Sequence, residues 1–173
     1  MGRRSILAIF TSLVASLMLA APVVAASDHR RVEMLDACDG PSFNAVIGDG
    51  ACIRKGGVTF DAFIGQLQSM GQAPAWRFTP GRLTVRAGGS VDAYNRGGEA
   101  HTFTEVAAFG GGCVDELNAV LGLSPVPECG DPALFGATLA PPGEEVEVED
   151  LSPGRHLFQC LIHPWMRTTV DVS

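Results

Sequence analysis

The sequence predicts an all-β domain, built as a sandwich or a barrel, from three observations. Apolar and polar residues alternate in several short runs, which is the period of half-buried strands. Turn-forming pairs such as Pro80-Gly81 and Gly88-Gly89 separate these runs. Helical patterns do not alternate with the runs, so a parallel sheet made of βαβ units is not expected.

The first 26 residues have the pattern of a secretory signal peptide. Arg3 and Arg4 precede a mostly apolar run over residues 6–21, and the small residues 24–26 form a cleavage site before Ser27. An uncleaved membrane anchor is the alternative, because the run approaches the ~20 residues that span a bilayer. Cleavage would place a protein without a membrane span in the periplasm or outside the cell.

The charge of the chain bears on its partners. The formal net charge is −7 at pH 7 and becomes more negative if Arg3 and Arg4 are removed. This argues against nucleic acid as a partner and allows a basic protein partner, although an acidic surface also serves solubility alone. We expect a monomer.

Five cysteines are present in a chain expected to be exported, where disulfides persist. Cys38–Cys52 and Cys113–Cys129 would each close a short loop containing Gly or Pro, and we favour these two among the three possible pairings of four cysteines. Cys160 is then left over, and binding a metal as thiolate is one way to retain a single thiol.

The N-terminal segment, residues 27–75, is predicted to be a loop-rich extension pinned by a disulfide. Turn formers are frequent in its first part, for example at residues 39–41 and 48–50. Apolar residues then recur at helical spacing from Thr59 to Met70, with Thr59 as N-cap and Gly71 as the end. This helix is expected to pack its apolar side on the rest of the domain.

The main domain is assigned to residues 76–173, with an ordered insertion over residues 110–137. The insertion is rich in Gly and Pro, and a short helix over residues 115–122 is expected to be capped by Asp115 and closed by Gly122. The expected strands are residues 76–79, 82–86, 90–95, 101–106, 145–149, 155–160 and 167–172.

The turn from Cys160 to Met166 is the strongest functional signal. It places a thiolate, the imidazole of His163 and a thioether within seven residues, at the end of a predicted strand. With a second imidazole from His101, these are the ligands of a blue-copper site, in which the thioether is the weak axial ligand. Zinc could use the thiolate and both imidazoles, but a thioether is a poor zinc ligand.

The residues of two blocks resemble a known family. Residues 76–106, with Trp-Arg-Phe-Thr-Pro at 76–80, Leu-Thr-Val-Arg-Ala-Gly at 83–88 and His101, together with residues 145–172, are similar to the cupredoxins of the plastocyanin and amicyanin type. The Cys-x-x-His-Pro-x-Met turn looks most like the short ligand loop of amicyanin. The resemblance does not extend to residues 27–75 or 110–137.

This resemblance implies a Greek-key β-sandwich of the cupredoxin type that holds one type 1 copper per chain. It implies that His101, Cys160 and His163 are the strong ligands and that Met166 is the axial ligand. Asn95 belongs to the matching block, and Thr102 stands where members commonly carry Asn as a polar brace. The other two histidines, His29 and His156, are outside the pattern.

Enzyme chemistry is not expected. A binuclear copper centre needs two cysteines in this turn, and only Cys160 is there. Coupled oxidase sites reach a second copper through a His beside the Cys, whereas Gln159 and Leu161 flank it here, and the chain has no His-x-His pair. We therefore expect a single-electron carrier with an unidentified redox partner. A module that stores or delivers copper is the alternative, because it would use the same ligands.

Two further expectations concern the turn itself. Ile162 keeps a backbone N–H where related loops often have Pro, so we hypothesise a second N–H···S bond to Cys160 and a raised potential, which Ile162→Pro should lower. Pro164 and Trp165 are expected to form an apolar rim where a partner docks and receives electrons through the edge of His163. Trp165 could equally be part of the core.

Overall fold

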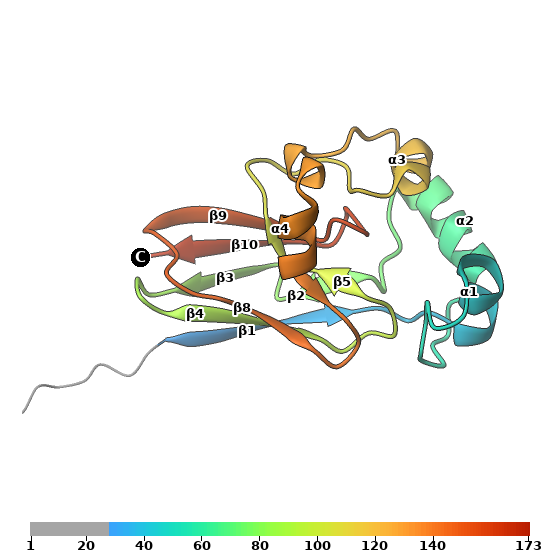
Figure 1. Cartoon of the computed structure of the whole chain (residues 1–173), viewed down its shortest axis with the longest axis horizontal. Helices are drawn as coiled ribbons and strands as arrows, with labels where there is room; N and C mark the ends of the chain where they lie inside the picture. The colour runs from blue at the N-terminus through green and yellow to red at the C-terminus, as the bar shows by residue number, and fades with distance from the viewer. Residues whose placement is uncertain (1–27) are drawn as a thin grey trace, which may run out of the picture.

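The structure is a computed structural model that describes residues 28–173 (Figure 1). The proposed signal peptide, residues 1–26, lies outside the described residues. Within residues 28–173, no helix is both long enough and apolar enough to cross a bilayer.

Two four-stranded sheets form the body of the domain (Figure 1). The first sheet has the order β2 (Arg77–Thr79), β1 (His29–Leu35), β4 (Ser90–Asn95) and β8 (Glu145–Val148). The second has the order β3 (Arg82–Val85), β10 (Arg167–Val172), β9 (Gly154–Gln159) and β6 (Thr104–Glu105). β1 runs parallel to β4 and β3 runs parallel to β10, while the other neighbours are antiparallel.

The inner faces of the two sheets share one hydrophobic core. Val32 of β1, Phe158 of β9 and Val170 of β10 are buried in it. Phe103 stacks on Phe158 with ring centroids 4.4 Å apart. Alternation of buried and exposed residues along the strands places these side chains inward, so the β-sandwich expected from the sequence is present.

β1 is the main departure from the expected fold. Residues 27–75 were expected to form a loop-rich extension, but His29–Leu35 lie between β2 and β4, with Val32 opposite Ala93. Val32 and Met34 are fully buried. The segment outside the sheets therefore begins only after Leu35, and the end of β1 leads directly from the sandwich into it.

The predicted helix of this segment is confirmed as α2 (Phe60–Met70). The hydroxyl of Thr59 accepts the N–H of Ala62 as its N-cap, and Gly71 ends the helix in the left-handed region at φ 68°. Phe63 and Leu67 are its buried residues. They anchor α2 against the end of the sandwich.

A second helix, α1 (Gly40–Ile47), was not expected. Its start, Asp39-Gly40-Pro41, was interpreted as a turn, but the Asp39 carboxylate caps a helix by accepting the N–H of Ser42. Pro41 lies in the first turn, where the missing N–H removes no helical hydrogen bond. The predicted Cys38–Cys52 disulfide is present and ties the start of α1 to the loop after it.

The strand expected over residues 101–106 is divided. β5 (His101–Thr102) pairs with β7 (Leu139–Ala140), whereas β6 pairs with β9 in the second sheet. Phe103 lies between β5 and β6 and fills the core. β5 therefore does not belong to the second sheet, and it lies toward the end of the sandwich where α1 and α2 lie (Figure 1).

The insertion contains the helices α3 (Asp115–Leu121) and α4 (Pro132–Ala137) and the 3-10 helix η1 (Pro127–Gly130). The predicted Cys113–Cys129 disulfide closes it. Gly122 ends α3 in the left-handed region as predicted, but Val114 is the N-cap and Asp115 makes no capping hydrogen bond. The N–H of Cys113 donates to the carbonyl of Leu161 at 2.6 Å, so the insertion also supports the turn after β9.

Candidate metal centre

Three donor side chains from separate elements meet at the end of the sandwich. His101 comes from β5, Cys160 follows the end of β9, and His163 lies in the turn between β9 and β10. One donor atom from each lies within 4.8 Å of the other two, and all three residues are buried. The Nδ1 atoms of the two imidazoles are 3.2 Å apart, and the Cys160 sulfur is 3.9 Å from Nδ1 of His163.

This donor set fits a single soft-ligand metal. Ligand bonds of about 2.0–2.3 Å from imidazole nitrogen and thiolate place such donors roughly 3–4 Å from one another. One thiolate with two imidazoles is the set that suits copper in an electron-transfer site, and zinc also accepts it. Cys160 is the free cysteine of the described chain, since the other four are paired.

The fourth proposed ligand, Met166, closes the same turn. Its side chain is fully buried, its N–H donates to the carbonyl of His163, and its carbonyl accepts the N–H of Cys160 at 3.0 Å. These two bonds close the backbone of the turn on itself. The assignment of the Met166 sulfur as the axial ligand stays a prediction.

Two backbone N–H groups point at the Cys160 sulfur. Thr102 and His163 each donate to it at 3.4 Å. The second donor is therefore His163, and not Ile162 as was expected from the sequence. The turn brings the N–H of the residue three positions after the cysteine to the sulfur, so the expected effect of Ile162→Pro on this bond no longer follows.

Thr102 braces the ligand turn through its side chain. Its hydroxyl oxygen accepts the N–H of Leu161 at 2.7 Å and the hydroxyl of Thr104 at 3.1 Å. All of these groups are buried, so the N–H of Leu161 would be costly to leave unpaired. A hydroxyl thus links β5 to the turn, at the position where Asn was expected from the resemblance.

Asn95 supports the loop that precedes His101. Its amide NH₂ donates to the carbonyls of Glu99 and Ala140, both at 2.8 Å, and its carbonyl oxygen accepts the N–H of Gly97. The side chain is fully buried. Asn95 therefore holds the loop at residues 97–99, which leads to His101.

Each imidazole has a buried carboxylate near its outer nitrogen. Nε2 of His101 lies 3.0 Å from Oδ2 of Asp36, whose side chain is fully buried. Nε2 of His163 lies 3.8 Å from Oε2 of Glu99, which also accepts the indole N–H of Trp76 at 2.5 Å. Carboxylates in this position fix the tautomer of a metal-binding histidine and increase its basicity.

The charges of the cluster stabilise one another in the metal-free protein. Burial raises the pKa of Asp36, but the hydrogen bonds from His101 and from backbone N–H groups hold it at about 2. Burial lowers the pKa of His101, but Asp36 and the Cys160 sulfur raise it to about 9. Burial opposes ionisation of Cys160 as well, yet the two imidazoles hold the pKa of its thiol well below the usual value. The neighbouring imidazoles thus favour the thiolate form of Cys160, and Asp36 with the Cys160 sulfur favours the protonated form of His101.

Glu99 differs from Asp36 in the direction in which its pKa is shifted. Burial raises its pKa, and the opposing effects of His163 and the Trp76 indole are smaller. Its backbone N–H also donates to Asp36 at 3.0 Å, so the two acidic residues belong to one hydrogen-bonded unit.

Helices cover the edge of His163 that was expected to face a partner. The imidazole is 3% exposed and packs against Phe63 of α2, Trp76 and Trp165, with ring centroids 5.5–6.5 Å away. Pro164 is buried, and the half-buried Trp165 donates its indole N–H to the carbonyl of Ala73 at 3.2 Å. The expected docking rim at Pro164 and Trp165 is therefore covered in this structure.

An apolar cavity of about 580 Å³ leads to His163 instead. Its walls come from α1, α2, α3 and Ile162, and both Glu99 and His163 lie on them. The lining residues Val46 and Ile47 are 61% and 56% exposed, so the cavity opens to solvent. Access to the site thus runs between helices that the family resemblance did not cover.

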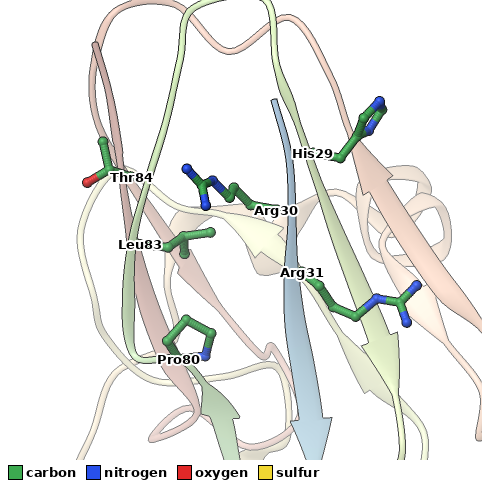
Figure 2. Close-up of a pocket in the computed structure, with 6 residues that line it drawn as sticks. All are labelled: His29, Arg30, Arg31, Pro80, Leu83 and Thr84. Carbon is green, nitrogen blue, oxygen red and sulfur yellow. The ribbon is translucent and has the colours of Figure 1, made fainter. Parts of the chain in front are cut away.

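A second hollow lies at the opposite end of β1 from Asp36 (Figure 2). Three basic residues, His29, Arg30 and Arg31, line it, but Figure 2 shows that only Arg30 points toward β3 while the other two point away. Arg30 is paired with Asp28 at 3.0 Å and Arg31 with Glu145 at 3.7 Å. The basic side chains do not converge, so the hollow offers no anion site.

Sequence reasoning missed Asp36 and Glu99. Asp36 lies 65 positions from His101 and in a segment interpreted as an extension. Glu99 lies two residues before His101, and that proximity was its only signal. Asp36 lies outside the two blocks of the family resemblance, and Glu99 lies inside the first block but is not part of its matching motifs.

No family model and no curated protein matches the chain. Similar solved structures include a purple cupredoxin from Nitrosopumilus maritimus, which is 13% identical, with a TM-score of 0.43 over 83% of this chain and 99% of that one. A mutant fern plastocyanin is 17% identical with a TM-score of 0.41 over the same shares, and a Cu(I) form of a mutant amicyanin is 19% identical with a TM-score of 0.37 over 56% and 73%. At this level of similarity we derive neither ligand nor activity from the matches.

Proposed function

We propose that this protein is an exported mononuclear copper protein that transfers single electrons between redox partners. The observation that carries the proposal is the buried cluster of His101, Cys160 and His163, whose donor atoms all lie within 4.8 Å. The proposal includes Met166 as the axial ligand, one type 1 copper per chain and the Greek-key connectivity of cupredoxins. It also includes a periplasmic or secreted, monomeric protein with a redox protein as partner.

The surroundings of the cluster support electron transfer. Type 1 copper supplies reversible one-electron chemistry, and its potential is tuned by hydrogen bonds to the thiolate and by the axial ligand. Here the sulfur accepts two backbone N–H groups, and the turn is held by Thr102 and by the insertion. Side chains fixed in this way change little between oxidation states, which favours fast transfer.

Copper storage or delivery is the second candidate function. The observation in its favour is the cover over His163, because an imidazole that is only 3% exposed is poorly placed for direct contact with a protein partner. A storage protein needs no such contact, and the same donor atoms would hold the ion.

Redox cycling distinguishes the two functions. A carrier loaded with copper should show an intense visible absorption that disappears on reduction and returns fully on oxidation over repeated cycles. The ion should stay bound in the presence of a copper chelator. A colourless Cu(I) protein that cannot be reoxidised reversibly and that gives its metal to the chelator would exclude the carrier function.

Copper binding is expected to release about one proton at pH 7. His101 is protonated there because its pKa is about 9, and it must lose that proton before Nδ1 can bind a metal. Affinity should therefore increase about tenfold per pH unit from pH 7 to 9, or ~1.4 kcal/mol per unit, and become flat above.

Calorimetric titration of the metal-free protein in buffers with different ionisation enthalpies measures this proton release. His156 provides an internal comparison, because burial lowers its pKa but Ser152 and Glu105 raise it, and it has no contact with the cluster. A His156→Gln variant should release the same number of protons as the unmodified protein. Release of no proton at pH 7 would contradict the protonation of His101 in the metal-free protein.

A further inference from the structure

We propose that Asp36 is a positioning residue of the copper centre, which orients His101 and lowers the reduction potential of the metal. The inference rests on the proposed function, since it assigns His101 as a copper ligand. It brings the end of β1 and the Cys38–Cys52 disulfide into the site.

The contact between Asp36 and His101 determines which imidazole nitrogen is free. A carboxylate only accepts hydrogen bonds, so Nε2 of His101, 3.0 Å from Oδ2, carries the ring proton. In the neutral ring Nδ1 then holds the lone pair, and Nδ1 is the atom that faces His163. The carboxylate thus selects the tautomer that a metal between the two imidazoles needs.

Asp36 is itself held in place from three directions. Its oxygens accept the backbone N–H groups of Gly98 at 2.8–2.9 Å, Glu99 at 3.0 Å and Cys38 at 3.2 Å. A Cβ atom on Gly97 would overlap Oδ2 of Asp36, so the loop depends on glycine to let the backbone approach. A side chain fixed by this many donors cannot turn away from His101 without leaving several buried N–H groups unpaired.

The disulfide makes this arrangement part of the N-terminal segment. Cys38 lies two residues after Asp36 and is bonded to Cys52. The neighbouring Ile53 donates its N–H to the carbonyl of Gly98 at 2.9 Å, so the loop that holds Asp36 is tied to the same disulfide. The segment outside the family resemblance therefore supplies a component of the centre.

The charge of Asp36 has a defined effect on the metal. A fully buried carboxylate beside a ligand stabilises the higher positive charge of Cu(II) more than that of Cu(I), because little solvent screens it. The hydrogen bond to Nε2 also makes Nδ1 a stronger donor, which again favours Cu(II). Both effects lower the reduction potential.

The test compares Asp36→Asn with Glu33→Gln in the full chain loaded with copper. Asn keeps the shape of the side chain and removes its charge. Glu33 lies on β1, which ends one residue before Asp36, and pairs with Arg96 at the surface, so its substitution removes a charge away from His101. We expect Asp36→Asn to weaken Cu(II) binding 10–100-fold relative to Cu(I) binding, which is a rise in potential of about 59–118 mV. Glu33→Gln should shift the potential by much less.

An Asp36→Asn variant that folds, shows the visible absorption of the unmodified protein and keeps its potential would overturn the inference. A measurement without any variant covers the case in which it does not fold. Nitrogen-15 NMR of the reduced, diamagnetic protein should show His101 protonated at Nε2 with slow exchange of that proton, and an unprotonated Nε2 would equally refute the role of Asp36. Failure of the proposed function is a separate result, because the unmodified protein would then show no thiolate-to-copper absorption.

Discussion

Removal of the Cys38–Cys52 disulfide, by the double substitution Cys38→Ser and Cys52→Ser, should lower the free energy of unfolding by about 3 kcal/mol. The bond joins residues 14 positions apart, and closing a loop of this size restricts the unfolded chain by about that amount. It also holds the loops around Asp36, so the variant should raise the reduction potential in the same direction as Asp36→Asn. Denaturant unfolding and voltammetry measure the two effects.

The second disulfide offers a matched control. Cys113–Cys129 joins residues 16 positions apart, so the double substitution Cys113→Ser and Cys129→Ser should cost a similar ~3 kcal/mol. It leaves the hydrogen bonds of Asp36 intact, and the potential should move less than in the first variant. Equal shifts of the reduction potential in both variants would contradict the link between the Cys38–Cys52 disulfide and Asp36. An unchanged free energy of unfolding in the first variant would contradict the structural role of that disulfide.

Phe43→Ala should destabilise the protein by about 3–5 kcal/mol, the usual cost of removing a buried aromatic ring. Phe43 of α1 is fully buried and contacts the rings of Phe60, Phe63 and Trp76, with centroids 5.3–5.8 Å away. It therefore joins both helices to the sandwich beside the metal site. Denaturant unfolding of the metal-free protein measures the loss.

Ile47 in the same helix is the control for this substitution. Its side chain is 56% exposed, so Ile47→Ala should change the free energy of unfolding by no more than about 0.5 kcal/mol. If Phe43→Ala lowered the free energy of unfolding no more than Ile47→Ala does, α1 and α2 would not pack on the sandwich as described. Chemical modification of the His163 imidazole would detect any exposure of His163 to solvent that Phe43→Ala causes.

The strands of the sandwich could be predicted where alternation and turn formers coincide. The runs that became β3 and β4 are bounded by Pro80-Gly81 and Gly88-Gly89, and their alternation decided the assignment. β1 has a shorter signal, because Val32 and Met34 alternate with charged residues only over its second half. Its partners β2 and β4 are distant in sequence, and parallel pairing with β4 produces no pattern in the local sequence.

The misinterpretation of α1 has a local cause. Asp, Gly and Pro in succession favour a turn, but the same residues begin a helix when the Asp side chain caps it and Pro occupies the first turn. Residues 42–47 would have to distinguish a turn from the start of a helix, but their helical pattern is too short to do so. The packing of Phe43 against α2 resolves the ambiguity in the folded protein.

The candidate site also has one part that could be predicted from the sequence and another part that could not. Cys160, His163 and Met166 lie within seven residues, so chemistry and spacing alone pointed to a metal turn. The tertiary fold was needed to find Asp36 and to identify His163 as the second N–H donor to the sulfur. The covering of His163 by α2 also depends on tertiary packing, which the sequence of the turn does not encode.

The visible and EPR spectra of the purified protein with one equivalent of Cu(II), beside those of a Cys160→Ser variant, test the central claim most directly. We expect an intense thiolate-to-copper absorption with a narrow copper hyperfine splitting in the unmodified protein, and the loss of both in the variant. Identical spectra for the two proteins, or a spectrum of copper bound only by nitrogen and oxygen, would contradict the claim that Cys160 binds copper.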